Sequence, residues 1–405
     1  MRFKLKALAA AAALALAAGA AQAQISGGVV KIGVLNDMSS LYADLGGQGS
    51  VTAAKMAIED FKAKEKGLNV EVVFADHQNK ADVGSQIANK WIDSEGVDMI
   101  VDVPNSGVAL AVNQIVRDKH KVFIDSGAAT SDLTGAKCSP NTVHWTYDTW
   151  MLAHGTGSAI VKRGGDTWFF LTADYAFGHA LERDTEDVVV KSGGKVVGKV
   201  RVPINTQDFS SFLLQAQSSK AKIIGLANAG GDTINSIKQA AEFGIVKGGQ
   251  NLAGLLVFLS DIHGLGLDKA QGLILTNTFY WDLNDSTRAW AKRFAALNGG
   301  KYPTMVQAGV YAGVLHYLKA VEALKSDDGD KVVAKMKEMP TDDPLFGKGT
   351  IRADGRKIHP AYLVEVKKPS ESKGPYDYYK ILATIPADQA FRPLSEGGCE
   401  LVAKK

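Results

Sequence analysis

Small and hydroxyl-bearing residues follow a short apolar segment near residue 126, and together they could bind an anion. Residues 122–124 are typical of a buried strand, and the segment Ser126-Gly127-Ala128-Ala129-Thr130-Ser131 follows where a helix is expected to begin. The first N–H groups of a helix have no backbone partner, and the helix dipole places positive charge at the same end. The segment therefore predicts a site for a small anion.

The same arrangement occurs once more, just upstream. Residues 98–103 are typical of a strand, Pro104-Asn105-Ser106-Gly107 follows as a loop, and a helix is expected to continue to about residue 118. Loops at the carboxyl ends of neighbouring parallel strands enclose the crevice in which α/β proteins bind ligands. The two segments together predict a crevice suited to a small carboxylate.

These two units belong to a longer alternation of strands and helices. Strands are predicted at 29–35, 69–74, 98–103, 122–124, 167–171, 195–203, 221–226, 255–258 and 272–276. Helices are predicted at 49–64, 82–94, 176–192, 209–218 and 233–243, and further helices at 285–297, 306–324 and 330–339. Short late strands are expected at 349–351, 362–366 and 378–381. Single helices between strands favour parallel sheets that are covered on both faces, so we expect an α/β fold with two doubly wound sheets of five or six strands.

The start of the chain has the pattern of an export signal. Three basic residues among the first six precede an apolar segment at 7–21, and Ala21-Gln22-Ala23 matches a signal-peptidase cleavage site. We therefore predict a signal peptide over residues 1–23, cleaved near Ala23, and a periplasmic protein. No cysteine stands directly after the predicted cleavage point, so a lipid anchor is not expected there.

Charge and length limit the classes of function. Removal of the predicted signal peptide takes away three basic residues and no acidic ones, so the formal charge of +3 falls to zero. A neutral chain argues against a nucleic-acid partner or an anionic membrane surface. About 380 residues would remain, which is more than one core usually supports, so two domains are expected.

Cys138 and Cys399 are the two cysteines of the sequence. In an oxidising compartment an isolated pair is more often a disulfide than two free thiols. We predict a Cys138–Cys399 bond that holds the C-terminal tail against the body of the protein.

Motifs of catalysis and metal binding are missing from the sequence. It contains no Gly-x-Ser-x-Gly elbow, no P-loop and no complete Gly-x-Gly-x-x-Gly after the first strand. The eight histidines show no short paired spacing typical of a metal site. We therefore expect a binding protein without enzymatic activity, metal or cofactor.

The order of the elements and their loops resembles a family of proteins. The segments at 31–61, 75–92, 126–134, 174–198 and 205–244 are similar to type I periplasmic solute-binding proteins of the leucine/isoleucine/valine-binding kind, the receptors of ABC importers. The resemblance covers essentially the whole mature chain. It implies two α/β lobes joined by three crossovers, with the ligand enclosed between them by hinge closure. The expected lobe segments are 24–146 and 277–346 for the first lobe, and 147–276 and 347–405 for the second.

The resemblance also implies which residues bind the ligand. In the first lobe one carboxylate-binding loop matches Asn105-Ser106-Gly107, a second loop matches Ala128-Ala129-Thr130, and the loop after the first strand places Tyr42 against the ligand. In the second lobe Tyr175 and the loop Asn228-Ala229-Gly230 are expected to cover the ligand from the other side. The family's acidic partner of an amino group would fall near Asp261.

Two departures from the amino-acid-binding pattern point to an aromatic acid. The chain lacks the Pro-Glu-Gly sequence expected near residue 261, which argues against a ligand with an α-ammonium group. The segment at 144–150 is unusually aromatic, and its Tyr147 could form a flat wall for a planar ligand, together with Tyr42 and Tyr175. The resemblance is closest to the receptors of this family that serve aromatic acids.

Alternatives remain at this point. Ser106 and Thr130 could be ordinary helix caps, and the tyrosines could cover the edge of a core. The ligand could also be a branched-chain or other apolar amino acid with Asp261 as its ammonium partner, or a short amide or urea. The same fold also serves in ligand sensors. The main hypothesis is a monomeric periplasmic receptor that delivers a small organic acid to an inner-membrane ABC permease.

Overall fold

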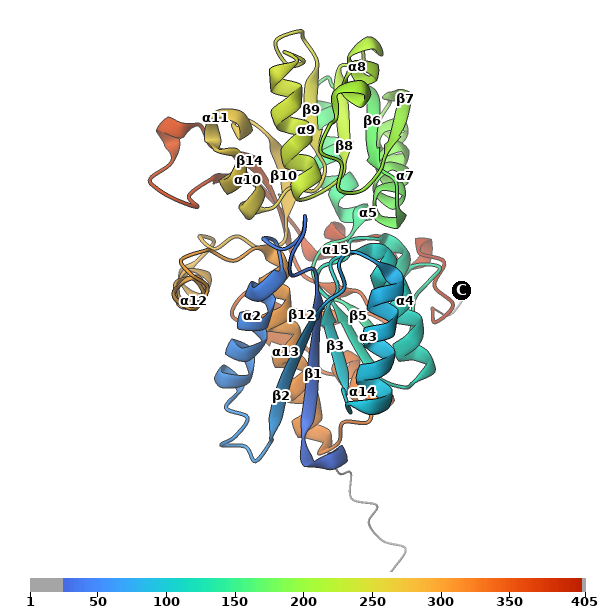
Figure 1. Ribbon diagram of the computed structural model, residues 1–405, viewed down its shortest axis with the longest axis vertical. Helices are drawn as coiled ribbons and strands as arrows, with labels where there is room; N and C mark the ends of the chain where they lie inside the picture. Colours follow the sequence, from blue (N-terminus) through green and yellow to red (C-terminus); the bar gives the residue numbers. More distant parts are fainter. Residues whose placement is uncertain (1–24, 403–405) are drawn as a thin grey trace, which may run out of the picture.

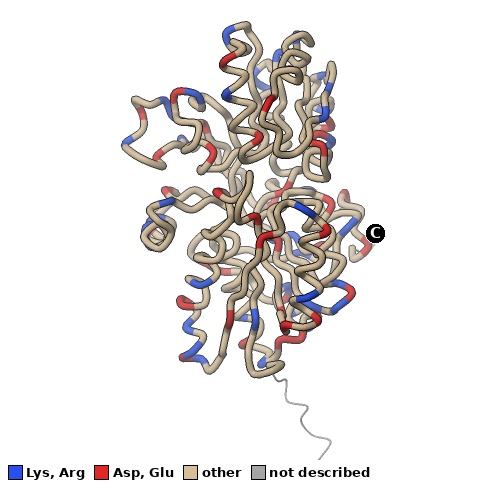
Figure 2. The backbone as a smooth tube through the Cα atoms, in the orientation of Figure 1, with Lys and Arg blue, Asp and Glu red and all other residues tan. Residues whose placement is uncertain are grey.

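The computed structural model describes residues 25–402 and has two lobes, which Figure 1 draws one above the other. The predicted signal peptide at 1–23 lies outside the described residues. Among residues 25–402, no helix combines the length and the apolar character needed to cross a membrane. Figure 2 shows basic and acidic residues interspersed along both lobes.

The first lobe is built on a parallel sheet of five strands in the order β2-β1-β3-β4-β5. Its strands β3 and β4 are buried along their whole length, as expected for a sheet covered on both faces. The strands are β1 (Val30–Asn36), β2 (Val70–Asp76), β3 (Met99–Asp102), β4 (Val122–Asp125) and β5 (Thr142–His144), and the helices that connect or follow them are α2 (Gly47–Phe61), α3 (Ala81–Ser94) and α4 (Ser106–Asp118).

Later segments of the chain return to complete this lobe. Helix α13 (Met305–Leu324) is apolar on nearly all sides and buried between α2 and the sheet, as Figure 1 shows from its place behind β1 and β2. It is accompanied by α12 (Asp285–Leu297), α14 (Gly329–Glu338) and a small antiparallel sheet of β11 (Thr341–Asp343), β12 (Gly347–Ile351) and β13 (Lys357–Ile358).

The small sheet shows to which lobe residues 347–358 belong. The sequence placed residues from 347 onward in the second lobe. In the structure β12 pairs with β11, and Arg356 bridges to His144 at the end of β5. Residues 347–358 therefore lie with the first lobe, and the chain crosses to the second lobe at 359–360. It returns to the first lobe after residue 385, because Cys399 is bonded to Cys138.

The second lobe contains a parallel sheet of four strands in the order β7-β6-β8-β9. The strands are β6 (Thr167–Ala173), β7 (Lys195–Val202), β8 (Ile223–Ala227) and β9 (Asn251–Gly254), and the helices are α7 (Ala176–Lys191), α8 (Ser210–Ser218), α9 (Gly231–Glu242), α10 (Leu259–Leu265) and α11 (Leu267–Ala270).

Strand β10 (Ile274–Asn277) differs from the prediction. It pairs antiparallel with β14 (Ala361–Val366), which in turn pairs with β15 (Tyr379–Ile385), so these three form a separate sheet. Its partner lies almost 90 residues later in the chain, and no local pattern shows such a pairing.

Three further elements differ from the expectation. Residues 255–258 lead into α10 instead of forming a strand, and the fourth strand is β9 just before them. The helix expected at Ser131 is one 3-10 turn, η2 (Ser131–Thr134). An unpredicted helix follows the first crossing as α5 (Thr149–Leu152), a π-turn η3 (Ala153–Gly157) and α6 (Ser158–Lys162). Short turns complete the chain at η1 (Ser26–Gly28), η4 (Pro369–Glu371), α15 (Ala387–Ala390) and η5 (Leu394–Glu396).

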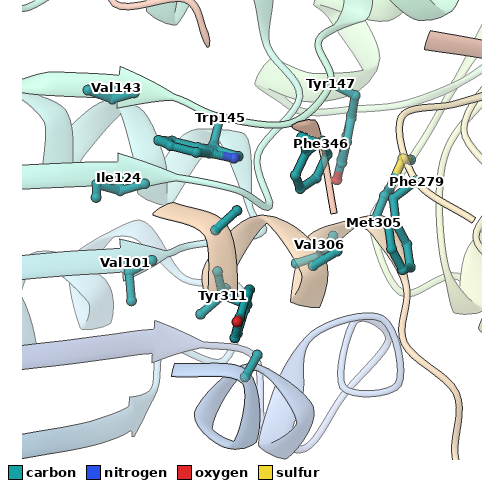
Figure 3. Close-up of a cluster of buried hydrophobic side chains, with 14 of the residues drawn as sticks. Val101, Ile124, Val143, Trp145, Tyr147, Phe279, Met305, Val306, Tyr311 and Phe346 are labelled. Atoms are coloured by element: carbon teal, nitrogen blue, oxygen red, sulfur yellow. The ribbon is translucent and has the colours of Figure 1, made fainter. Parts of the chain in front are cut away.

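A buried cluster links the first sheet to the crossings. Figure 3 shows Val101, Ile124 and Val143 of neighbouring strands, Met305 and Val306 of α13, and the rings of Trp145 and Tyr147 from the first crossing. Trp145 and Tyr147 are fully buried. The first crossing is therefore anchored in the core of the first lobe.

The predicted disulfide is confirmed. Cys138 and Cys399 are bonded, with their Cα atoms 5.6 Å apart. Beside them, the guanidinium of Arg392 donates to the carbonyl of Ser131 at 2.8 Å, and Arg117 pairs with Glu400 at 2.7 Å. The C-terminal tail is thus held against the first lobe next to the loop that follows β4.

Candidate ligand-binding site

A small cavity lies between the lobes, where the carboxyl ends of both parallel sheets meet. Its free volume is only about 10 Å³, room for about one water molecule and far below the roughly 300–1,000 Å³ common for small-molecule pockets. No charged side chain belongs to its described lining, which is mostly apolar and aromatic. The lining residues are Tyr42, Leu45, Pro104, Gly127, Ala129, Tyr147, Tyr175, Phe177, Ala229, Leu256 and Phe258.

Two tyrosines close the cavity from opposite lobes. Tyr42 follows β1 and Tyr175 follows β6, and their hydroxyl oxygens are 2.5 Å apart. Burial is the largest cause that raises the pKa of each hydroxyl above its usual value of about 10. Both hydroxyls are therefore neutral near pH 7 and can donate as well as accept a hydrogen bond.

A backbone contact joins the lobes beside this pair. The N–H of Gly231 donates to the carbonyl of Leu41 at 3.2 Å. The preceding residue, Gly230, has a φ of 58°, and a Cβ there would stand 2.4 Å from the Leu41 oxygen. Glycine at 230 is thus what allows the two loops to approach. The described arrangement of the lobes is a closed one.

The loop after β3 contributes a helix start to the site. The side-chain oxygen of Asn105 accepts from the N–H groups of Gly107 at 2.9 Å and Val108 at 3.1 Å, so Asn105 caps α4. The hydroxyl of Ser106 is buried and accepts from the N–H of Thr130 at 3.2 Å. This hydrogen bond brings the two predicted carboxylate-binding loops together.

The loop after β4 is held by a buried carboxylate. Asp125 accepts from the N–H groups of Gly127 at 3.1 Å and Ala128 at 2.8 Å. A Cβ on Gly127 would stand 2.7 Å from the Cα of Pro104, so the close packing of the two loops requires glycine there. The Thr130 hydroxyl accepts from the N–H of Asp132 at 3.3 Å and caps η2.

Backbone donors without a partner lie at the meeting point of these loops. Among the hydrogen bonds of the described residues, the N–H groups of Ser106 and Ala129 have no acceptor. One belongs to the first residue of α4, and the other to a residue that lines the cavity. Such N–H groups suit a carboxylate oxygen.

A buried carboxylic acid, Asp102, lies below these loops. Asp102, at the end of β3, and the next residue, Val103, both have positive φ, 87° and 57°. Asn36 donates to the Asp102 carboxylate, and the Ser126 hydroxyl donates to it at 3.3 Å. Burial raises the pKa of Asp102 to about 7. The strained backbone turns the chain toward Pro104 and the cavity.

Tyr147 forms the wall on the side of the crossings. Its hydroxyl donates to the carbonyl of Gly127 at 2.5 Å, and its ring meets Phe258 edge to face with centroids 5.8 Å apart. The buried guanidinium of Arg356 donates to the Thr146 carbonyl at 2.7 Å and holds this segment in place. Trp145 and Trp150 do not line the cavity; Trp150 stacks on His154 at 3.5 Å.

The polar residues predicted from the second lobe are bonded within that lobe. The Asn228 side chain donates to the Ser236 hydroxyl at 2.9 Å and accepts from the Thr233 hydroxyl at 2.7 Å. The Asp261 carboxylate accepts from the N–H of Phe258 at 2.9 Å at the start of α10, and burial raises its pKa to about 7. Of the predicted loop 228–230, Ala229 lines the cavity.

Six lining residues were not among the predicted ligand-binding residues: Gly127 and five others. The five others are apolar: Leu45, Pro104, Phe177, Leu256 and Phe258. Phe177 lies two residues after Tyr175, and Phe258 falls in the segment predicted as a strand. Apolar residues near strand ends look like core residues in a sequence, so this signal does not separate a ligand wall from a core.

The described residues contain no group of three or more metal-ligating side chains that could hold an ion.

Comparison with known proteins gives consistent matches. The periplasmic binding protein family matches residues 29–374. A solved periplasmic binding protein from Burkholderia mallei is 56% identical, with a TM-score of 0.90, over 93% of this chain and 99% of that one. A branched-chain amino acid ABC transporter periplasmic ligand-binding protein from Burkholderia xenovorans is 44% identical, with a TM-score of 0.81, over 92% and 99% of the two chains.

A more distant structure shares the fold. An ABC transporter solute-binding protein of Rhodopseudomonas palustris, solved in complex with benzoate, is 23% identical with a TM-score of 0.80, over 92% of this chain and 100% of that one.

Proposed function

The chain belongs to the periplasmic binding protein family, whose members are substrate-binding components of ABC transporters and not enzymes, and we propose that its ligand is a small aromatic carboxylate. The observation that carries this proposal is the composition of the cavity. Six of its lining residues, Tyr42, Tyr147, Tyr175, Phe177, Leu256 and Phe258, offer flat or apolar surface, and none is charged.

The anchor for the carboxylate is the meeting point of the loops after β3 and β4. The proposed donors are the N–H of Ala129, which lines the cavity, together with the N–H and hydroxyl of Ser106 and the hydroxyl of Thr130, which belong to the same two loops but do not line it in the closed arrangement. The amino end of α4 adds favourable dipole charge. The carboxylate group would thus lie toward the first lobe, and the ring between the aromatic side chains.

Closure of the lobes would complete the site. The closed arrangement excludes water, and hydrogen bonds are stronger in a site of low dielectric constant. A receptor with micromolar affinity needs about −8 kcal/mol of binding free energy. Hydrogen bonds to a charged group supply roughly 1.5–3 kcal/mol each, and burial of a ring about 25 cal/mol per Å² of apolar surface.

A branched-chain amino acid is the second candidate. It is favoured by the 44% identical relative that is described as a branched-chain amino acid receptor, and by the buried carboxylate of Asp261 near the Phe258 wall. Against it, the Asp261 carboxylate already accepts from the N–H of Phe258 and caps α10. The proposal therefore keeps the aromatic acid first.

We also propose where the protein acts and with which partner. Export to the periplasm follows from the signal peptide predicted at 1–23, and an inner-membrane ABC permease is the proposed partner. We propose that the receptor acts as a monomer, because each chain contains both walls of the cavity.

A thermal-shift screen of the mature protein tests the ligand class. Benzoate and cinnamate would be compared with leucine, valine and a short amide. A ligand at a hundredfold its Kd adds about 2.7 kcal/mol of stability, a rise of a few degrees in Tm. We expect the rise with the aromatic acids; a rise only with leucine or valine would replace them by the second candidate.

A matched variant ties any shift to this cavity. In Ala129→Leu the larger side chain would occupy the space between the tyrosines, so the same acids should produce no rise in Tm. A rise of equal size in the variant would show that these acids bind outside this cavity.

A further inference from the structure

A second contact between the lobes lies outside the cavity, beside the second crossing. Its centre is Tyr376, in the segment between β14 and β15 of the second lobe. The Tyr376 ring stacks on His263 of α10 with centroids 4.4 Å apart, and on Tyr302 with centroids 5.1 Å apart. We call His263, Tyr376 and Tyr302 the aromatic bridge. None of the three lines the cavity.

Tyr302 belongs to the first lobe. It lies between α12 and α13, and its neighbours on both sides are bonded to the loop after β1. Lys301 pairs with Asp44 at 2.8 Å, and the hydroxyl of Thr304 donates to the carbonyl of Leu45 at 2.6 Å. Tyr302 is therefore attached to the loop that carries Tyr42 and Leu45 of the cavity wall.

Tyr376 is held in the second lobe by its backbone. Its φ of 66° is unusual for a tyrosine. The carbonyl of Tyr376 accepts from the Tyr280 hydroxyl at 3.1 Å and from the indole N–H of Trp281 at 2.8 Å. The residue as a whole is almost completely buried, with 8% exposed. The ring position is thus imposed by contacts other than the one with Tyr302.

The bridge connects both walls of the cavity by an outer route. One end, His263, lies on α10, which starts directly after the lining residue Phe258. The other end, Tyr302, is attached to the loop of Tyr42. Tyr302 also meets Trp281 of the second crossing, with centroids 4.8 Å apart. Because Tyr302 and Tyr376 belong to different lobes, rotation of the lobes away from each other would disturb the stack of Tyr302 on Tyr376.

We propose that the stacking of Tyr302 on Tyr376 stabilises the closed arrangement of the lobes and so retains the ligand without touching it. This inference rests on the proposed function, because it assumes a ligand that closure encloses. An aromatic pair of this kind changes an equilibrium constant by roughly 2- to 12-fold. The open population and the rate of ligand dissociation should both rise by this factor when the pair is removed.

The test combines small-angle scattering with dissociation kinetics on the mature protein. The variants are Tyr302→Ala, Tyr376→Ala and the double variant, with Tyr302→Leu as a variant that keeps apolar bulk. We expect a larger radius of gyration without ligand in all of them. For bound benzoate we expect dissociation to be 2- to 12-fold faster, with association changed less than 2-fold.

The control is Tyr378→Phe. The Tyr378 hydroxyl contacts His263 at 2.7 Å, and both residues belong to the second lobe. Its removal takes away a hydrogen bond of the same cluster without affecting the interlobe stack, so the radius of gyration should equal that of the wild type.

Two results would overturn the inference. The first is a wild-type radius of gyration in the single variants. The second is a double variant whose radius of gyration increases by the sum of the increases in Tyr302→Ala and Tyr376→Ala, because the two rings would then act independently. Failure of benzoate to bind the wild type would overturn the proposed ligand instead, and the scattering data would still decide the role of the bridge.

Discussion

Tyr42 and Tyr175 come from different lobes and from loops 133 residues apart, and their hydroxyl oxygens are 2.5 Å apart over the cavity. Among the hydrogen bonds of the described residues, neither hydroxyl has another partner. The pair therefore links closure of the lobes to the chemistry of the site, because neither hydroxyl has this partner when the lobes separate.

Removal of one hydroxyl of this pair should weaken ligand binding. In Tyr175→Phe the buried Tyr42 hydroxyl loses its partner, which costs about 1–3 kcal/mol, so the Kd for benzoate should rise roughly 5- to 150-fold. The double variant Tyr42→Phe/Tyr175→Phe should cost less than the sum of the single variants in calorimetric titrations. Tyr311→Phe, which removes a hydroxyl bonded to Asp60 within the first lobe, is the matched control and should leave the Kd unchanged.

The loop contact between Ser106 and Thr130 should matter for the carboxylate. Ser106→Ala removes a proposed donor and leaves the N–H of Thr130 without its acceptor. We expect a 10- to 100-fold rise in Kd, since a hydrogen bond to a charged group contributes roughly 1.5–3 kcal/mol. Thr130→Val should also weaken binding while the protein stays folded. Ser210→Ala, at the same position of helix α8, is the control; an equal loss there would remove the Ser106 hydroxyl from the site.

Asp261→Asn separates the two candidate ligands. The carboxamide oxygen can still accept from the N–H of Phe258, so α10 keeps its cap. For an aromatic acid the Kd should change less than about 2-fold, because Asp261 does not line the cavity. For an amino acid it should rise 100-fold or more, since the ammonium group would lose its only charged partner. Titrations with benzoate and leucine, side by side, decide between these outcomes.

Asp102 should make stability depend on pH. Its pKa is about 7 in the folded chain and about 3.9 in an unfolded one. Between these values the folded state binds the proton more tightly, so this group's contribution to the free energy of unfolding falls as pH rises from 4 to 7 and then levels off. The difference in free energy of unfolding between wild type and Asp102→Asn should fall by about 3 kcal/mol over this range.

Urea unfolding at pH 4.5, 5.5, 6.5 and 7.5 measures this difference. Buried histidines such as His77, whose pKa burial lowers to about 4, make the free energy of unfolding rise with pH. Both proteins contain these histidines, so their contribution cancels in the difference. A constant difference across the range would mean that Asp102 is ionised in the folded protein.

The sequence predicted the parts of the site that depend on local pattern. The strand, loop and helix units around Ser106 and Ser126 follow from short apolar segments and small residues, and the structure has both loops at neighbouring strand ends. Local pattern cannot show which polar residues use their groups elsewhere. Asn228 and Asp261 have the chemistry of ligand partners, yet Ser236, Thr233 and the N–H of Phe258 occupy them.

Contacts between segments far apart in the chain could not be predicted from the sequence either. The antiparallel pairing of β10 with β14, the return of β12 and β13 to the first lobe, and the stack of Tyr302 on Tyr376 each join segments far apart in the chain. The walls at Phe177 and Phe258 face the cavity only because the second lobe folds over the first. The pattern of apolar residues is the same whether such a ring meets a core or a ligand.

The bond between Cys138 and Cys399 has a consequence for the order of maturation. The two cysteines are separated by 261 positions, and the second lies six residues before the last one. A chain that enters an oxidising compartment from the N-terminus would therefore expose a lone thiol at 138 for nearly the whole of its passage, and the bond can form only after residue 399 has entered. Any product that stops before residue 399 keeps that thiol. Reactivity toward a thiol reagent thus distinguishes complete molecules from prematurely terminated ones.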